Sequence, residues 1–477
     1  MVERSGRSST LQIVDAHHGA DNSKVNKRGS TLGLVMDGVS TGSSGKLAKG
    51  RYVPGSNIPK PPNFDGNGVR AIIMHPLSVL LLLLPFGIIA KFAEYDDTYV
   101  FFLNFLAMIP LAKILGDATE ELAVGLKNDM LAGLLNATFG NAVEMVIMIQ
   151  TLRAGMYDVV KATLLGSVLS NTLLVLGMSF FLGGILGGKK KTIKMPKQSV
   201  SKNNLRASSV AFSNGREEED AGHGFVAEKV QHFSVLNALV NISMLLMSCL
   251  ALSLVTVFQS VTNSAGVSGI DGKVLPISRV CSVLIVSAYC AYIVFQLVTH
   301  REALAEDNVD DEEDEEEHIS VPAATALLLG ATVIVAFCSE LLVGALEGVT
   351  KGAHISQHFI GIILLPIVGN ACEHAAAVRF AIQDKPGLSI GIAIGSSTQI
   401  SLFVVPFSVL IGWALGHPMD LNFGALNTTV MTISVIVVLS MVVDGSSNWL
   451  QGYLLMIAYL VVGVLYWNLP DDLPEVE

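Results

Sequence analysis

The sequence predicts an all-α polytopic membrane protein with eleven transmembrane helices, arranged as one N-terminal helix followed by two inverted five-helix repeats. Of its 477 residues, 51% are hydrophobic and only 15% are charged, whereas a soluble chain carries about a quarter charged residues. Apolar stretches of about 20 residues, long enough to cross a ~30 Å hydrocarbon layer as helices, recur from Ala71 to the end of the chain. Two short motifs also recur at one fixed spacing. The chain is therefore expected to fold mostly in lipid.

The expected spans follow a polar tail and are separated by polar or charged segments. Residues 1–70 are rich in Ser and Gly and hold ten Lys or Arg against five acidic residues, which predicts a disordered cytosolic regulatory tail. Residues 469–477 form a short C-terminal tail. The spans are expected at 71–90, 98–123, 131–152, 160–186, 233–258, 277–299, 320–346, 357–381, 388–415, 423–443 and 448–468.

Two charged loops set the expected orientation. Lys189 to Arg206, after the fourth span, contain seven basic residues and no acid, and short cytosolic loops are enriched in Lys and Arg. The N-terminus and the acidic linker at 300–319, after the sixth span, are then also cytosolic. In that linker, ten of the twelve residues from Glu306 to Glu317 are acidic, which fits either a solvated linker or a cation-collecting segment. An odd number of spans places the C-terminus on the other side.

The sequence contains an internal repeat. The segments GNAVEMVIMI and GNACEHAAAV begin at Gly140 and Gly369, which are 229 residues apart, and the Gly-Ser pairs at Gly166 and Gly395 have the same separation. Because each unit has five spans, the second unit enters the membrane from the side opposite to the first, as in inverted-repeat transporters. The repeat units are 98–299 and 320–468, and the span at 71–90 stands outside them.

Each repeat carries one glutamate in the middle of an expected span. An ionised carboxylate at that depth costs several kcal/mol, and no Lys or Arg lies at helical spacing to pair with Glu144 or Glu373. Asn141 and Asn370 precede these glutamates by three residues and therefore share a helix face with them. A single motif of this kind is explained as well by a packing glycine next to a buried acid as by an ion site. Its duplication at equal depth favours an ion site.

Carboxylates, amides and hydroxyls without a thiolate form a hard oxygen site. Such a site suits Ca²⁺, which takes about six to eight oxygens, and Mn²⁺ fits nearly as well. Protons compete for the same carboxylates because burial favours their neutral form, and exclusive occupancy gives antiport. Ser167, Ser170 and the neighbouring Asn171 fit interhelical hydrogen bonds as well as a ligand role. The expected metal ligands are Glu144, Glu373, Asn141, Asn370, Ser396, Gln399, Ser167 and Ser170.

Proton coupling and close helix packing complete the expected site. His374 could relay protons, or it could be a packed polar residue with a backbone partner. Glycines in both motifs leave room for another backbone to approach. The residues expected to couple protons are Glu144, Glu373 and His374, and the motif glycines are Gly140, Gly369, Gly166 and Gly395.

Several long motifs resemble the two signature repeats of the vacuolar cation/proton exchangers, the CAX family. They are GNAVE, LLGSVLSNTLLVLG, ILLPIVGNACEHAAAV and GSSTQISLFVVP, and the resemblance covers nearly everything from Ala71 to Asp472. The segments YIVFQLVTHRE, MDLNFG and VVDGSSNW are similar to those of plant-type members.

The resemblance implies exchange of cytosolic Ca²⁺ for lumenal H⁺ across the vacuolar membrane. It implies a transporter rather than an enzyme, with no cofactor, with membrane lipid around it and with no nucleic-acid partner. The central metal-binding acids of the family fall on Glu144 and Glu373, its signature amides on Asn141 and Asn370, and two further oxygens on Ser396 and Gln399. In plant relatives the N-terminal tail is autoinhibitory, so a regulatory protein or an intramolecular contact is expected at this tail.

Other functions stay open at the level of sequence. Within transport, the alternatives are an exchanger for Mn²⁺ or other divalent cations and a Na⁺-coupled Ca²⁺ exchanger. A Ca²⁺ channel would need a continuous oxygen-lined pore. An intramembrane hydrolase is disfavoured because the sequence has no HExxH motif and the GSSTQ segment has no convincing His partner.

Overall fold

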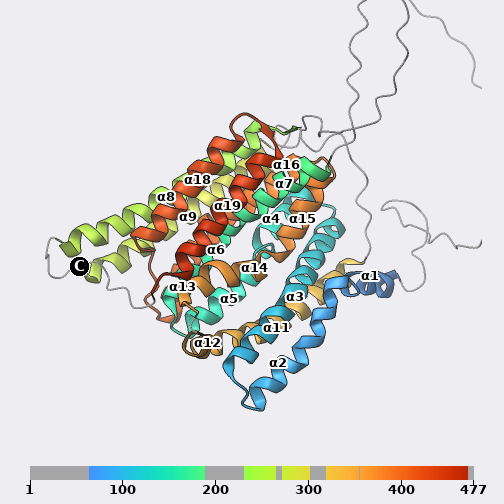
Figure 1. Cartoon of the computed structure of the whole chain (residues 1–477). Helices are drawn as coiled ribbons and strands as arrows, with labels where there is room; N and C mark the ends of the chain where they lie inside the picture. The colour runs from blue at the N-terminus through green and yellow to red at the C-terminus, as the bar shows by residue number, and fades with distance from the viewer. Residues whose placement is uncertain (1–63, 188–229, 265–270, 301–318, 354, 471–477) are drawn as a thin grey trace, which may run out of the picture. The chain divides into compact units, whose positions relative to one another are not determined.

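The computed structural model describes residues 64–187, 230–264, 271–300, 319–353 and 355–470, which are almost entirely helical (Figure 1). Most of the expected N-terminal tail, the basic loop, most of the acidic linker and most of the C-terminal tail lie outside the described residues. The helices before the linker are α1 (Phe64–Ile73), η1 (Pro76–Leu82), α2 (Leu83–Phe92), α3 (Asp97–Leu126), α4 (Asp129–Phe139), α5 (Ala142–Arg153), α6 (Tyr157–Leu169), η2 (Ser170–Val175), α7 (Leu176–Leu186), α8 (Val235–Ser264), α9 (Asp271–Val294) and η3 (Phe295–Thr299).

The second half repeats this order of long, short and broken helices. Four of the short elements are π-helical: η2, η5 and η6 lie within longer helices, and η3 ends the helix that begins with α9. Element η1 is a 3₁₀ helix. The helices after the linker are α11 (Val321–Gly344), α12 (Leu346–Ala353), α13 (Gln357–Phe359), η5 (Ile360–Leu364), α14 (Leu365–Gly369), α15 (Ala371–Ile382), α16 (Pro386–Gln399), η6 (Ile400–Val404), α17 (Val405–Leu415), α18 (Ala425–Val442) and α19 (Trp449–Trp467).

The prediction of an all-α membrane protein is confirmed, but the count of eleven spans is not. Among the described residues, eight helices are long and apolar enough to cross a membrane, and the count rises to ten if each of two bent helix pairs is one span. The expected span at 131–152 is not among them because the chain leaves the helical conformation at Gly140 and Asn141. The resulting helices α4 and α5, of 11 and 12 residues, are each too short to cross alone.

The expected span at 71–90 falls on one of the two bent helix pairs. Helix α1 ends at Ile73, η1 begins at Pro76, and the two directions differ by 78°. His75 is extended, with φ −86° and ψ 152°, because the ring of a following proline disfavours the α-helical conformation. The proline therefore starts a new helix instead of lying within one.

The repeat found in the sequence is also a repeat of local structure. The continuous helix α6–η2–α7 covers 157–186, and the continuous helix α16–η6–α17 covers 386–415. The first residues of the two helices are 229 positions apart, and so are their last residues. Each contains a π-helical turn in its middle. The helix breaks at Asn141 and Asn370 have the same separation.

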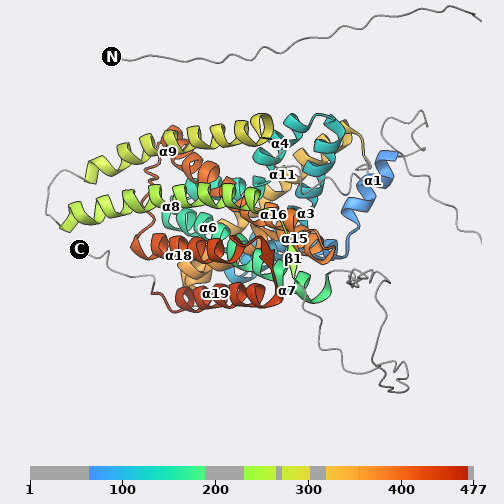
Figure 2. The same ribbon diagram turned by 90° about the horizontal axis from the view of Figure 1, so that it is seen from above.

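The buried apolar side chains form two clusters, and helix α5 contributes to both. One cluster surrounds α6, α7, α16 and α17, with α8, α18 and α19 packed around them, and the other lies between α3, α11 and α2 (Figures 1 and 2). Ala142, Val143 and Ile147 at the start of α5 belong to the second cluster, whereas Met148 and Leu152 belong to the first. The start of α5 therefore lies where the two clusters meet.

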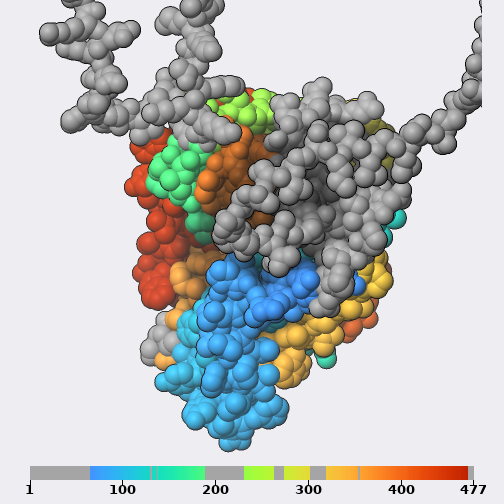
Figure 3. Space-filling model, turned by 90° about the vertical axis from the view of Figure 1, so that its right-hand side faces the viewer, coloured from blue at the N-terminus to red at the C-terminus, as the bar shows by residue number. Residues whose placement is uncertain are grey.

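The N-terminal helices contact the first helix of the second repeat. Figure 3 shows α1 and α2, in blue, beside α11, in yellow-orange. The Asp65 carboxylate accepts hydrogen bonds from Ser320 N at 2.7 Å and from Ser320 Oγ at 2.9 Å, and Ser320 is the N-cap residue of α11. Asp65 thereby satisfies a backbone donor at the start of that helix.

A two-stranded antiparallel sheet joins the segments that precede α8 and α19. Strand β1 (Gln231–His232) pairs with β2 (Ser446–Ser447), with Gln231 opposite Ser447. The side chain of Gln231 is buried beneath this sheet and reaches the end of α15.

Candidate ion-binding site

Each of the two glutamates lies in the first turn of a helix that begins inside the apolar part of the protein. Helices α5 and α15 start directly after Asn141 and Asn370, whose backbones are not helical (φ −106°, ψ 28° and φ −85°, ψ 12°). The expectation of glutamates in the middle of continuous helices is therefore wrong. First-turn N–H groups have no partner within their helix and form the positive end of its dipole, which stabilises a negative charge at Glu144 and Glu373.

Glu144 lies against the break in the other repeat. It is only 1% exposed, and both of its carboxylate oxygens have no hydrogen-bond partner among the described residues. A Cβ atom on Gly369 would lie 2.8 Å from Glu144 Oε1, so this close approach requires a glycine. A Cβ atom on Gly140, its counterpart, would instead meet the Asn136 carbonyl of the preceding helix α4.

Glu373 follows Gly369, the residue against which Glu144 packs, by four residues, so the two carboxylates belong to one region of the protein. Glu373 is partly buried, and its Oε2 atom also lacks a hydrogen-bond partner in the described structure. Two neighbouring carboxylates repel each other when both are ionised. The pair can be neutralised by protons or by a cation placed between them.

The asparagine of the first repeat binds polar side chains of the second. Asn141 Nδ2 donates to Gln399 Oε1 at 2.7 Å, and Asn141 Oδ1 accepts from Ser396 Oγ at 3.2 Å. Asn171 Nδ2 donates to the same Ser396 Oγ at 3.0 Å, which is the interhelical bond that the sequence left as one of two possibilities. The predicted residues Asn141, Ser396 and Gln399 therefore form one network.

The asparagine of the second repeat binds the first repeat at the equivalent place. Asn370 Nδ2 donates to the backbone carbonyl of Ser167 at 3.1 Å. The Oδ1 atom of Asn370 and the hydroxyls of Ser167 and Ser170 are buried, and the described residues offer them no partner. Since Ser167 and Ser170 correspond to Ser396 and Gln399 at the 229-residue spacing, each asparagine faces the helix of the opposite repeat.

His374 has a backbone partner on one side of its ring. Its Nδ1–H donates to the carbonyl of Asn370 at 2.8 Å, one helical turn earlier, while Nε2 is buried and unpaired within the described structure. This geometry fits the interpretation as a packed polar residue. The free Nε2 atom leaves one position from which the ring could exchange a proton.

The remaining motif glycines are not equivalent. A Cβ atom on Gly166 would collide with the backbone of Ile362, so α6 and η5 approach each other closely there. Around Gly395 there is open space, and no atom lies within 4 Å of such a Cβ. The two glycines of the Gly-Ser pairs therefore have different surroundings although they occupy equivalent positions in the repeats.

Sequence reasoning did not single out a charged pair on α3. Lys113 and Asp117, four residues apart, form an ion pair, and both side chains are partly buried. Gly116 packs directly against Cys372, next to Glu373, so this face of α3 borders the start of α15. The signal was present as a Lys and an Asp at helical spacing within an apolar span. In the described residues, no three His, Cys, Asp or Glu side chains form a metal-binding group.

Comparison with known proteins identifies the family. A family model described as sodium/calcium exchanger protein matches residues 97–298 and 323–467, from α3 to η3 and from α11 to α19. The chain belongs to this family. Members similar to it include vacuolar cation/proton exchanger 3 of Oryza sativa subsp. japonica, 40% identical over 84% of this chain and 87% of that protein. Vacuolar cation/proton exchanger 5 of Arabidopsis thaliana is 40% identical over 81% of this chain and 80% of that protein. The resemblance to the vacuolar exchangers is therefore confirmed, and the family is one of transporters.

Solved structures of exchangers share the fold. Native YfkE superposes with a TM-score of 0.63 at 29% identity and covers 82% of this chain and 100% of its own. The H⁺/Ca²⁺ exchanger CAX gives a TM-score of 0.55 at 13% identity over 84% of this chain and 92% of its own, a likeness of fold alone.

Proposed function

We propose that this exchanger is a secondary active antiporter that moves cytosolic Ca²⁺ into the vacuole in exchange for lumenal H⁺, at one site shared by Glu144 and Glu373. The observation that carries the proposal is the buried Glu144 carboxylate, which has no partner in the described structure and touches Gly369 of the opposite repeat. An ionised carboxylate in such a place needs a proton or a cation. Relatives named vacuolar cation/proton exchangers, and YfkE, named a Ca²⁺/H⁺ antiporter, support this choice.

The unpaired oxygens suit a hard divalent cation. Besides the two carboxylates, Asn370 Oδ1 and the hydroxyls of Ser167 and Ser170 are buried without partners in the described part of the chain. Ca²⁺ takes about six to eight oxygens, some from water, and tolerates irregular geometry. Asn141 is already hydrogen-bonded to Ser396 and Gln399. These three side chains would either position the other ligands or replace their mutual hydrogen bonds by bonds to the cation.

Competition at this site couples the two ions. Protons arriving from the acidic lumen neutralise both carboxylates and release Ca²⁺, and the protonated protein then reopens to the cytosol. His374 is a candidate for passing these protons through its free Nε2 atom. The positive charge of Lys189 to Arg206 supports an orientation with the N-terminus and the acidic linker in the cytosol and the C-terminus in the lumen.

Transport into sealed vesicles with an acidic interior tests the proposal. Ca²⁺ uptake should collapse when a protonophore removes the gradient, and Glu144→Gln or Glu373→Gln should abolish it because neither variant can hold the cation's charge. Glu347→Gln is the matched control, since Glu347 is exposed on α12 and accepts a hydrogen bond from Lys351 at 2.5 Å. Robust uptake by either site variant would reject the site.

The same assay separates the other transport functions. Uptake that follows a Na⁺ gradient and ignores pH would identify a Na⁺-coupled exchanger, and preferred uptake of Mn²⁺ would change the substrate but not the site. Ion currents far faster than a transport cycle would identify a channel.

A further inference from the structure

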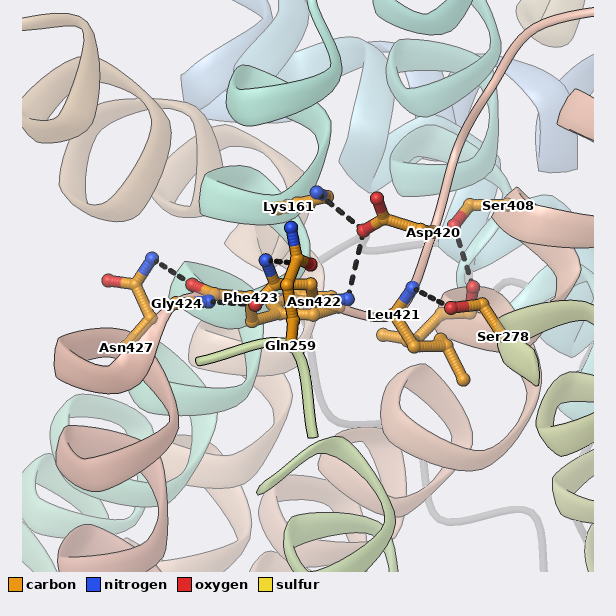
Figure 4. Close-up of polar contacts among 11 residues, drawn as sticks. Lys161, Gln259, Ser278, Ser408, Asp420, Leu421, Asn422, Phe423, Gly424 and Asn427 are labelled. Carbon is orange, nitrogen blue, oxygen red and sulfur yellow. Dashed lines mark hydrogen bonds and ion pairs between the residues drawn. The ribbon is translucent and has the colours of Figure 1, made fainter. Parts of the chain in front are cut away.

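The loop that connects α17 and α18 is bonded to three other helices. Figure 4 shows Asp420 in this loop directed at Lys161 of α6, and the ion pair between Asp420 Oδ1 and Lys161 Nζ measures 2.7 Å. Asn422 Nδ2 donates to Gln259 of α8 at 2.6 Å, and Leu421 N donates to Ser278 of α9 at 3.1 Å. The loop therefore joins the second repeat to α6, α8 and α9 of the first.

The loop is anchored by alternate buried side chains. The side chains of Met419, Leu421 and Phe423 are buried, with 1%, 0% and 4% exposure, so every second residue is inserted into the bundle. Between them, Asn422 N donates to Asp420 Oδ1 at 2.9 Å, which fixes the carboxylate that receives Lys161. The D-x-N-x-G spacing of this loop would suit a cation, but the ammonium of Lys161 already takes that carboxylate.

The ion pair holds the start of the helix that carries part of the candidate site. The Lys161 and Asp420 side chains are only 13% and 24% exposed, and removing one partner of a buried pair leaves the other charge uncompensated. Lys161 precedes Ser167 by six residues, a rise of about 9 Å along α6. Ser167 supplies the carbonyl that binds Asn370. A shift at the start of α6 would therefore move the oxygens of the site.

The connection between α7 and α8 is also bonded to a helix of the other repeat, with an amide as the donor. Gln231, after α7, donates to Ala381 O at 2.9 Å and to Asp384 Oδ1 at 3.0 Å at the end of α15. Gly183 of α7 packs on Ala381 of α15. At the 229-residue spacing, Gly183 corresponds to Gly412 of α17 and Ala381 corresponds to Leu152 of α5, and these two residues also face each other. The Gln231 connection is thus bonded to the end of α15, whereas the Asp420 connection is bonded to α6, so the two connections fix different helices.

We propose that Lys161 and Asp420 are positioning residues, whose ion pair fixes α6 against the second repeat and so sets the cation affinity of the site formed by Glu144 and Glu373. The inference rests on the proposed function. It assigns a role in cation binding to two residues that lie outside the binding site, and it predicts that the affinity depends on the pair and not on either charge alone.

The expected effect is a loss of affinity without a matching loss of turnover. A misplacement of about 1 Å can cost on the order of 100-fold in a positioned site, and we expect Lys161→Met or Asp420→Asn to raise the KM for Ca²⁺ about tenfold. The maximal rate should stay within about twofold because the glutamates are untouched. Lys161→Arg keeps the positive charge and should keep the wild-type KM. The exchanged pair Lys161→Asp/Asp420→Lys should restore the KM that the single variants raise.

Vesicle uptake and Ca²⁺-dependent thermal unfolding of the purified full chain test the inference together. Lys351→Met, which breaks the exposed pair with Glu347, is the matched control and should behave like the wild type. If Lys161→Met does not fold, Asp420→Asn, which keeps the side-chain shape, is measured in its place.

A raised KM with a smaller Ca²⁺-induced shift in Tm, both restored in the exchanged pair, supports the inference. An unchanged KM in the single variants overturns it, and so does a raised KM that the exchanged pair fails to restore. Wild-type protein that neither transports nor is stabilised by Ca²⁺ would instead reject the proposed function, so the two failures are distinguishable.

Discussion

Gly369→Ala tests the contact that brings the two repeats together at Glu144. The new Cβ would lie 2.8 Å from Glu144 Oε1, 3.1 Å from its Cδ and 3.2 Å from its Cγ, whereas ordinary contacts begin at 3.4 Å. The carboxylate must therefore move by about 0.6 Å or the helices must separate. Overpacking of this kind costs about 1–3 kcal/mol, which corresponds to a loss of affinity of about 5- to 150-fold if it falls on the occupied site.

Gly395→Ala is the matched control, because its Cβ meets no atom within 4 Å. Ca²⁺ affinity is measured from the shift in the thermal unfolding of purified protein over a range of Ca²⁺ concentrations, and transport is measured in parallel in acidic vesicles. Gly369→Ala should lose affinity and Gly395→Ala should keep it. Equal affinity of Gly369→Ala and the wild type would show that Glu144 does not bind the cation where it touches Gly369.

Two further variants examine contacts between distant parts of the chain. Asn141→Leu removes the bonds to Gln399 and Ser396 and should lower the Ca²⁺ affinity about tenfold in the same unfolding assay. Asn237→Leu on α8 is the control. An unchanged affinity of Asn141→Leu would place this network outside the site. Asp65→Ala removes the cap on Ser320, so hydrogen exchange at the first amides of α11 should become about fivefold faster, and unchanged exchange would contradict the capping role.

Much of the fold could be predicted because membrane helices have a strong composition signal. Long apolar segments fixed most spans, and the 229-residue spacing fixed the pairs of equivalent helices. The helix breaks were harder to place. Neither Gly140 nor Asn141 forbids a helix, so no local signal marked the break, and the start of α5 lies where two apolar clusters meet. At His75 the following proline indicated a helix break, but the apolar residues around it favoured one continuous span.

The candidate site was predictable in its residues but not in its pairing. Spacing alone placed Asn141 and Glu144 on one helix face, yet the partners of Asn141 are more than 250 residues away. The unequal packing at Gly166 and Gly395 was also hidden, because identical motifs predict identical surroundings. A sequence repeat determines which elements correspond, whereas the conformation of each half depends on its neighbours.

The crossed arrangement of the asparagines bears on how such a chain could arise. Asn141 binds side chains contributed only by the second half, and Asn370 binds a carbonyl contributed only by the first. A single half would therefore lack partners for its own asparagine and could complete the arrangement only by associating with an upside-down copy of itself. Gene duplication and fusion would then have made permanent an assembly that a shorter ancestor had to form by chance encounters in the bilayer.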